Sequence, residues 1–261
     1  MNCLSLQIYR KKTEIVVFCR RKSLNLGDKK CFLVRSVAFF TVILDFSGVY
    51  EAEDFRPAGS TRLDLRDLEG TECYCDPQSA DRIRRRIASV VGDGSHVPGI
   101  HWLDGGDYHY ASLFFLERIA RPFTLVLIDN HPDDQRGAFG GDLLSCGGWV
   151  AEARDTLPML KETVWIREAG RETALLDLPV YLSIDKDVLS GDYARTNWDQ
   201  GTMTLPQLKD AVRAIASRHE ILGIDVCGEL SSAKGAFDGD YAINRATNLE
   251  LQDFLVSLQT Q

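Results

Sequence analysis

The chain is 261 residues long, with 44% hydrophobic residues, 26% charged residues and a formal net charge of −8. These proportions are ordinary for a folded globular protein and argue against disordered and fibrous classes. No apolar run approaches the roughly 20 residues that a membrane-spanning helix needs. The negative net charge argues against a nucleic-acid partner, because such a partner favours a basic face.

The charge is unevenly distributed along the chain. Residues 1–40 contain nine Lys or Arg and two Asp or Glu, whereas residues 41–261 contain 21 and 36. We therefore expect residues 1–37 to be a basic N-terminal extension of uncertain status and residues 38–261 to form a single domain. A targeting segment, an appendage and a start codon placed too far upstream are all open interpretations of the extension.

The chain has seven cysteines, an odd number, and their spacing is not regular. Cys73 and Cys75 are too close for an easy disulfide and lack the C-x-x-C spacing of zinc and redox sites. We therefore expect reduced thiols in a cytoplasmic protein.

Short apolar runs alternate with helical stretches in the rest of the chain. The runs are nearly continuous in apolar residues, which is typical of strands covered on both faces. They lie at 39–46, 99–104, 124–129, 163–168, 179–185 and 220–226. Helices are expected at 79–91, 108–120 and 204–218, the last with a Thr cap and an early Pro. This alternation predicts an α/β fold with a parallel sheet and helices on both faces.

Four of the expected strands end on an aspartate: Asp104, Asp129, Asp185 and Asp225. In an open parallel sheet, ligands bind outside the carboxyl ends of the strands. We therefore expect these four acids to be placed where they can point into one shared crevice.

Two short motifs add more metal-binding side chains at this edge. The stretch "DNHPD" carries Asp129, His131 and Asp133 after one strand, and "SIDKD" carries Asp185 and Asp187 after another. A solvated acidic turn is the simplest alternative, but carboxylates at this density repel one another unless cations neutralise them. Carboxylates with imidazole suit manganese, zinc or iron, and bridging carboxylates suit two ions.

Three motifs, in this order, resemble those of the ureohydrolases, the family of arginase and agmatinase. "DGGDYH" at 104–109 looks like the Gly-Gly-Asp-His motif of that family, "DNHPD" like its Asp-x-His-x-Asp motif, and "SIDKD" like its Ser-x-Asp-x-Asp motif. The resemblance covers residues 99–230 and implies an arginase-type three-layer α/β/α sandwich with a mostly parallel sheet.

The resemblance also implies a binuclear centre with two Mn²⁺, although Zn²⁺ or Fe²⁺ would suit the same ligands. By position, Asp129 and Asp185 would bridge the ions, Asp133 and His109 would serve one ion, and His131 and Asp187 the other. A hydroxide bridging the ions would then attack a guanidinium carbon, or another amide-like carbon, and expel an amine.

One departure from the family concerns the histidine of the first motif. The family has His directly after Gly-Gly-Asp, where this chain has Tyr108 followed by His109. If the helix begins one residue later, His109 reaches the metal. Otherwise Tyr108 faces it, because neighbouring side chains on a helix diverge by roughly 100°. We expect His109 to be the ligand.

Two further departures lie where the resemblance implies proton transfer and substrate contacts. Cys146 replaces a proton-transferring His, and it could shuttle protons, act as a nucleophile, add a soft ligand or be a small buried residue. Glu229 is displaced by one position from the guanidinium-binding Glu and could equally be a loop acid. Gln135 stands at a substrate-contacting position and could donate one hydrogen bond. The acidic stretch at 234–241 is expected to be a flexible loop near the entrance.

Together these patterns predict a metal-dependent hydrolase of the ureohydrolase type, acting on carbon–nitrogen bonds other than peptide bonds. Asp133, Cys146 and Glu229 are the expected catalytic residues, and Gln135 and Glu229 the expected substrate contacts. The expected partner is a small cationic amine or guanidino compound, and ureohydrolases are usually homo-oligomers.

Two alternatives stay open. One is a single-zinc deacylase of the related deacetylase fold, in which a second carboxylate at Asp187 would be less useful. The other is a catalytically silent metal-binding protein.

Overall fold

The computed structural model describes residues 40–91, 99–136, 143–170 and 175–258, together with the backbone strands at 5–11, 14–20 and 34–36. Contacts divide the chain into two units, Met1–Phe39 and Phe40–Gln261. The first unit contains an antiparallel sheet in the order β1 (Ser5–Lys11), β2 (Glu14–Arg20) and β3 (Val34–Ser36). The status of this basic segment as an extension stays a prediction.

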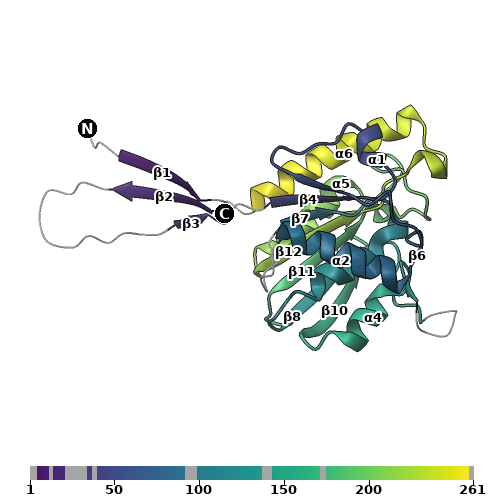
Figure 1. Cartoon of the computed structure of the whole chain (residues 1–261), viewed down its shortest axis with the longest axis horizontal. Helices are drawn as coiled ribbons and strands as arrows, with labels where there is room; N and C mark the ends of the chain where they lie inside the picture. Colours follow the sequence, from purple (N-terminus) through teal and green to yellow (C-terminus); the bar gives the residue numbers. More distant parts are fainter. Residues whose placement is uncertain are drawn as a thin grey trace, which may run out of the picture. The chain divides into compact units, whose positions relative to one another are not determined.

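The second unit is built on a parallel sheet of seven strands (Figure 1). Every pairing between neighbouring strands of this sheet is parallel, which confirms the expected fold class. In spatial order the strands are β10 (Leu160–Ile166), β8 (Phe123–Ile128), β11 (Val180–Asp185), β12 (Ile221–Cys227), β7 (Gly99–Trp102), β4 (Phe40–Asp45) and β5 (Thr61–Asp64).

The central strands are covered on both faces. Every residue of β7, β8 and β11 is buried, in agreement with their nearly continuous apolar sequences. Figure 1 places α5 and α6 on one side of the sheet and α2 and α4 on the other. Helix α3 contacts α4. The helices are α1 (Val49–Ala52), α2 (Pro77–Val91), α3 (Ser112–Leu116), α4 (Trp149–Thr156), α5 (Leu205–Ala216) and α6 (Asp238–Ser257).

Short elements connect these layers at the carboxyl edge of the sheet. Strands β6 (Tyr74–Cys75) and β9 (Leu144–Ser145) form a separate antiparallel pair. Three 3₁₀ turns follow the ends of strands: η1 (Gly106–Ala111), η2 (Lys186–Val188) and η3 (Ser232–Lys234). Two of them, η1 and η2, carry the motifs that the sequence analysis singled out.

Two helical regions differ from the sequence expectation. The helix expected at 108–120 is a 3₁₀ turn, η1, followed by the short helix α3. The stretch 234–241, expected to be a flexible loop, contains the first turn of α6, which begins at Asp238. The expected Thr cap of α5 is confirmed: the Thr204 side chain accepts from the Gln207 backbone N–H in a capping box.

Asp104 joins the loops at the carboxyl ends of three strands. Its carboxylate accepts hydrogen bonds from the backbone N–H groups of Phe46 and Ser47 after β4, both at 2.8 Å, and from Gly105 at 2.7 Å. Its backbone carbonyl accepts from Gly228 after β12 at 3.0 Å. Its φ of 74° is strained for a residue other than glycine and is held by these contacts.

No helix among the described residues combines the length and the apolar character needed to cross a membrane.

We expect Asp104→Asn to destabilise the fold by about 1–3 kcal/mol, because the amide can present only one of the two accepting oxygens. Urea unfolding would measure this change. Asp253→Asn, on the exposed face of α6, is the matched control and should change stability by less than about 0.5 kcal/mol. Equal effects of the two substitutions would contradict the role of Asp104.

Candidate metal centre

The six expected metal ligands come together at the carboxyl edge of the sheet. Strands β8 and β11 are neighbours, and Ile128 pairs with Ile184, so the residues that follow them are adjacent. Asp129 follows β8, and Asp185 is the last residue of β11. We call the group the carboxylate–histidine cluster; its members are His109, Asp129, His131, Asp133, Asp185 and Asp187.

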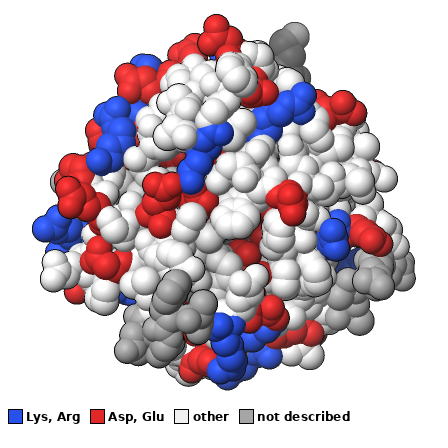
Figure 2. Space-filling view, turned by 90° about the vertical axis from the view of Figure 1, so that its right-hand side faces the viewer, with Lys and Arg blue, Asp and Glu red and all other residues white. Residues whose placement is uncertain are grey.

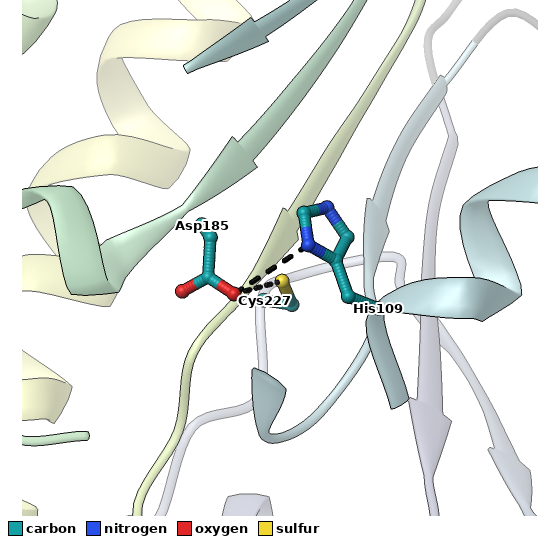
Figure 3. A group of neighbouring side chains, drawn as sticks. All are labelled: His109, Asp185 and Cys227. Carbon is teal, nitrogen blue, oxygen red and sulfur yellow. Dashed lines mark hydrogen bonds and ion pairs between the residues drawn. The ribbon is translucent and has the colours of Figure 1, made fainter. Parts of the chain in front are cut away.

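The first half of the cluster surrounds His109, which η1 projects toward the ends of β8 and β11. Its Nδ1 lies 2.9 Å from Asp133 Oδ2, 3.3 Å from Asp129 Oδ2 and 3.6 Å from Asp185 Oδ2. Figure 3 shows the ring directed at the carboxylate of Asp185. Tyr108 instead stacks on Phe46, with ring centroids 4.3 Å apart. Adjacent side chains on a 3₁₀ helix diverge by about 120°, so only His109 can face the carboxylates.

The second half surrounds His131, in the loop after β8. Its Nδ1 lies 2.8 Å from Asp187 Oδ2 and 3.8 Å from Asp129 Oδ1. Asp187 is held in turn by the backbone N–H of Asn130, at 3.1 Å, and its own N–H donates to Asp185 at 2.9 Å. Asp129 therefore lies between the two histidines.

Burial sets the protonation of the cluster. It raises the pKa of Asp129 well above its usual value, and the neighbouring charge of Asp133 adds to the effect. Burial, followed by the charge of Asp187, raises the pKa of Asp185 to about 7. Burial lowers the pKa of His109, but its contacts with Asp129 and Asp133 outweigh this and leave it well above the usual value. The chain by itself thus offsets part of the negative charge with protons, a role that cations could take.

Two buried atoms of the cluster are suited to a metal ion. His109 Nδ1 and Asp129 Oδ2 lie close to neighbouring polar atoms but form no hydrogen bond of good geometry. His109 Nε2 lies 2.8 Å from Ser183 Oγ, so a proton on Nε2 leaves the Nδ1 lone pair facing the carboxylates. Three groups could each hold an ion, with ligand atoms within 4.8 Å of one another: His109–Asp129–Asp133, Asp129–His131–Asp187 and His109–Asp185–Cys227. The oxygen and nitrogen donors suit manganese, zinc or iron.

Glycines allow the backbone to approach Asp185 closely. A Cβ on Gly106 would lie 3.1 Å from Asp185 Oδ2 and 2.8 Å from the Trp198 ring. Gly228 has a φ of 95°, and a Cβ there would lie 2.4 Å from Asp185 Oδ1. Larger residues at either position would displace the carboxylate.

Two aspartates that the sequence analysis placed in the same crevice point elsewhere, so that expectation was wrong for Asp104 and Asp225. Asp104 turns back toward the β4 loop, as described above. Asp225 lies inside β12, two residues before its end, and accepts from Tyr181 Oη at 2.6 Å in the core. The residue at the strand end is Cys227, whose thiol donates to Asp185 at 3.0 Å (Figure 3).

Three supporting residues were not expected from the sequence. Trp149 Nε1 donates to Asp133 Oδ2 at 2.7 Å, and Ser183 and Cys227 contact His109 and Asp185. Ser183 and Cys227 each lie two residues from an aspartate that was singled out, on the same face of a strand, which is a usable signal. Trp149 begins a helix that the sequence analysis did not predict.

A cavity of about 260 Å³ opens onto the cluster. Besides the ligands, its walls include Cys73, Tyr74, Gln135, Ser145, Cys146 and Trp198, all of them uncharged side chains. Figure 2, which looks onto the right-hand side of Figure 1, shows acidic and basic residues interspersed, with no patch of one sign covering that face. The negative charge of the site is therefore concentrated in the carboxylate–histidine cluster.

A curated bacterial protein is a clear relative of this chain. No family model matches the sequence. An uncharacterised protein from Thermotoga maritima is 32% identical over 202 residues, which cover 72% of this chain and 78% of that protein. The chain belongs to the same family as this protein.

Several solved structures have a similar fold. Proclavaminate amidinohydrolase from Streptomyces clavuligerus superposes with a TM-score of 0.58 at 15% identity, covering 86% of this chain and 93% of that one. Arginase from Bacillus caldovelox gives 0.52 at 14%, covering 86% and 99%. An arginase-like protein from T. brucei, a triple mutant bound with Mn²⁺, gives 0.53 at 14%, covering 84% and 90%. The chain has the fold of the ureohydrolase superfamily. This confirms the three-layer architecture that the motifs implied.

Cys146, which replaces the His of the ureohydrolase motif, lies on the cavity wall. It is buried, and burial together with the nearby thiol of Cys73 raises its pKa well above the usual range. A thiolate nucleophile needs a lowered pKa, so this environment does not favour a nucleophilic role.

Glu229 lies outside the cavity, in a buried polar group. Its carboxylate is 2.5 Å from Lys186 Nζ and accepts from Asn248 at 2.9 Å, and Lys186 is itself fully buried. Glu53 completes the group and also accepts from Asn248. The role of Glu229 as a substrate contact stays a prediction, while its observed partner is Lys186.

We expect Lys186→Met to destabilise the fold by about 3–5 kcal/mol, because it leaves the Glu229 carboxylate buried without its cation. Lys209→Met is the matched control: Lys209 pairs with Glu250 at the surface, so its loss should cost less than about 1 kcal/mol. Denaturant unfolding of both variants would measure the difference. A cost for Lys186→Met as small as that of the control would contradict the buried pair.

The buried group also predicts a pH dependence of stability. Burial, followed by the charge of Glu229, raises the pKa of Glu53 from 4.5 to about 10. Between these values the folded chain keeps a proton that the unfolded chain loses, so the stability contributed by Glu53 falls as the pH rises. We expect Glu53→Gln to remove this slope, which is at most about 1.4 kcal/mol per pH unit. Parallel slopes for the variant and the unaltered protein in urea unfolding would rule this out.

Proposed function

We propose that this protein is a metal-dependent hydrolase of the ureohydrolase type, cleaving a carbon–nitrogen bond of a small guanidino or amidino compound. The carboxylate–histidine cluster is the observation that carries the proposal. Its four carboxylates and two imidazoles match the ligand number that two divalent ions require, and the four carboxylates and His131 line one cavity. Two Mn²⁺ are the proposed cofactor.

The ligands divide between two ions in this proposal. His109 and Asp133 would hold one ion, His131 and Asp187 the other, and Asp129 and Asp185 would bridge them. Asp129 supports this arrangement because it contacts both histidines. A pair of such ions lowers the pKa of a bound water and so supplies hydroxide at neutral pH.

The chain's own residues would orient the ligands and manage protons. The Trp149 indole N–H donates to Asp133, and the contact of His109 Nε2 with Ser183 orients the ring of His109. We propose Asp133 as the acceptor of the proton that the attacking water loses, since its carboxylate lines the cavity. Cys146 would shape the cavity wall, because burial keeps its thiol protonated.

The cavity walls are compatible with a small polar substrate. The side chains named on the wall besides the cluster are neutral, so the substrate would meet uncharged groups around the ions. Gln135 can donate a hydrogen bond to a polar end of the substrate. Pockets for drug-sized ligands begin at about 300 Å³, so a cavity of about 260 Å³ suits a small substrate.

Metal analysis and activity of Asp129→Asn test the proposal together. We expect about two ions per chain after reconstitution with Mn²⁺, measured by plasma mass spectrometry. Release of urea or ammonia from a panel of guanidino and amidino compounds should fall on the order of 100-fold or more in Asp129→Asn, because the bridging ligand is lost.

The matched control for this test is Asp134→Asn. Asp134 is exposed in the same loop and pairs with Arg154 at the surface, so its loss should leave metal content and activity unchanged. Absence of bound ions after reconstitution would overturn the metal centre. Bound ions without hydrolysis of any compound in the panel would overturn the enzymatic function and leave a metal-binding protein.

A further inference from the structure

Two cysteines face each other across the short antiparallel pair beside the cavity. In this pair Tyr74 is opposite Ser145 and Cys75 is opposite Leu144. Continuing the register by one residue places Cys73 opposite Cys146. The Cys146 N–H donates to the Cys73 carbonyl at 2.9 Å, which keeps the two residues adjacent where the chain turns at Cys73, whose φ is 58°.

The geometry of such a pair suits a disulfide. Residues that face each other in a hydrogen-bonded antiparallel pair have Cα atoms about 5.5 Å apart. Disulfides span Cα separations of about 4.4–6.8 Å. Both residues line the same cavity, and both thiols are free. Cys73 also contributes directly to the raised pKa of Cys146, as expected of a close neighbour.

We propose that Cys73 and Cys146 form a reversible disulfide on the wall of the cavity, a redox-sensitive modification site. A small-molecule disulfide is the proposed oxidant. One thiol, after losing its proton, attacks the oxidant and releases one small thiol, and the second cysteine then displaces the other. The two cysteines lose two hydrogen atoms in total, and the oxidant is reduced to two thiols.

The surroundings tolerate this change. Cys73 is only partly buried and its thiol donates to Asp107 at 3.3 Å, a contact that oxidation would break. Asp107 would keep three other partners: Asn197 at 3.0 Å, Trp198 at 3.1 Å and Lys234 at 3.0 Å. Burial, followed by the charge of Asp107, raises the pKa of Cys73 to about 11, so the exchange should be slow at neutral pH and faster in mild alkali.

The disulfide would alter access to the metal centre. It would connect the segment around β6 to the segment around β9 and remove two thiols from the wall of a cavity of about 260 Å³. In a cavity of this size, a fixed cross-link on the wall restricts the space for a substrate. The ligands themselves are not touched, so metal content should not change.

Peptide mapping of the full-length protein tests the proposal. After incubation with oxidised glutathione in mild alkali, the expected product is a cross-link between tryptic peptides 67–82 and 137–154, with the loss of two hydrogen atoms. Dithiothreitol should reverse it. Cys73→Ala and Cys146→Ala should each abolish the cross-link. Cys75→Ala, which removes the other cysteine of the first peptide, should keep it.

The readout is a mass and needs neither bound metal nor hydrolysis, so it stands apart from the test of the proposed function. Glutathione adducts without a cross-link would overturn the proposal, as would a cross-link that persists in Cys73→Ala and disappears in Cys75→Ala. Because the two alanine variants act on different segments, misfolding of one leaves the other as a test.

Discussion

Mutual repulsion among buried carboxylates is the constraint on which this structure depends. The parallel sheet places the ends of β8 and β11 side by side, and the acids that follow them cannot move apart without disrupting strand pairing. Burial makes each charge costly, and neighbouring acids make it costlier. The interspersed histidines offset part of this cost, and divalent cations would offset more of it. Buried acids with perturbed pKa values that gather at one edge of a sheet are typical of functional sites.

The residues around the cluster hold it in place from several directions. Asp104 ties the loop after β7 to those after β4 and β12. The buried Lys186–Glu229 pair anchors η2 directly beside Asp187. These contacts position the side chains of the cluster without an ion, which would lower the entropic cost of binding one.

Much of this architecture could be predicted from the sequence because its signals are local. Continuous apolar runs indicated the strands, and Asp-x-His-x-Asp after such a run placed three members of the cluster at once. The sequence alone did not decide whether Tyr108 or His109 faces the cluster, because the answer depends on the residue at which the helical turn begins. Asp225 was misplaced because it lies inside β12, which continues to Cys227. Helix α6 was missed because its first turns are acidic and resemble a loop.

Contacts between side chains far apart in the sequence could not be predicted from local patterns. The ion pair of Glu229 joins a loop after β12 to η2, and Trp149 reaches Asp133 from α4. The facing of Cys73 and Cys146 depends on a two-residue strand pair that has no periodicity to detect. Such contacts follow from how the layers pack, which no single stretch of sequence encodes.

Anomalous diffraction from a crystal grown with Mn²⁺ tests the central claim most directly. The account predicts two adjacent peaks at the carboxyl edge of the sheet, one beside His109 and Asp133 and the other beside His131 and Asp187. A map with no peak among these residues, or with the manganese bound elsewhere, would contradict it.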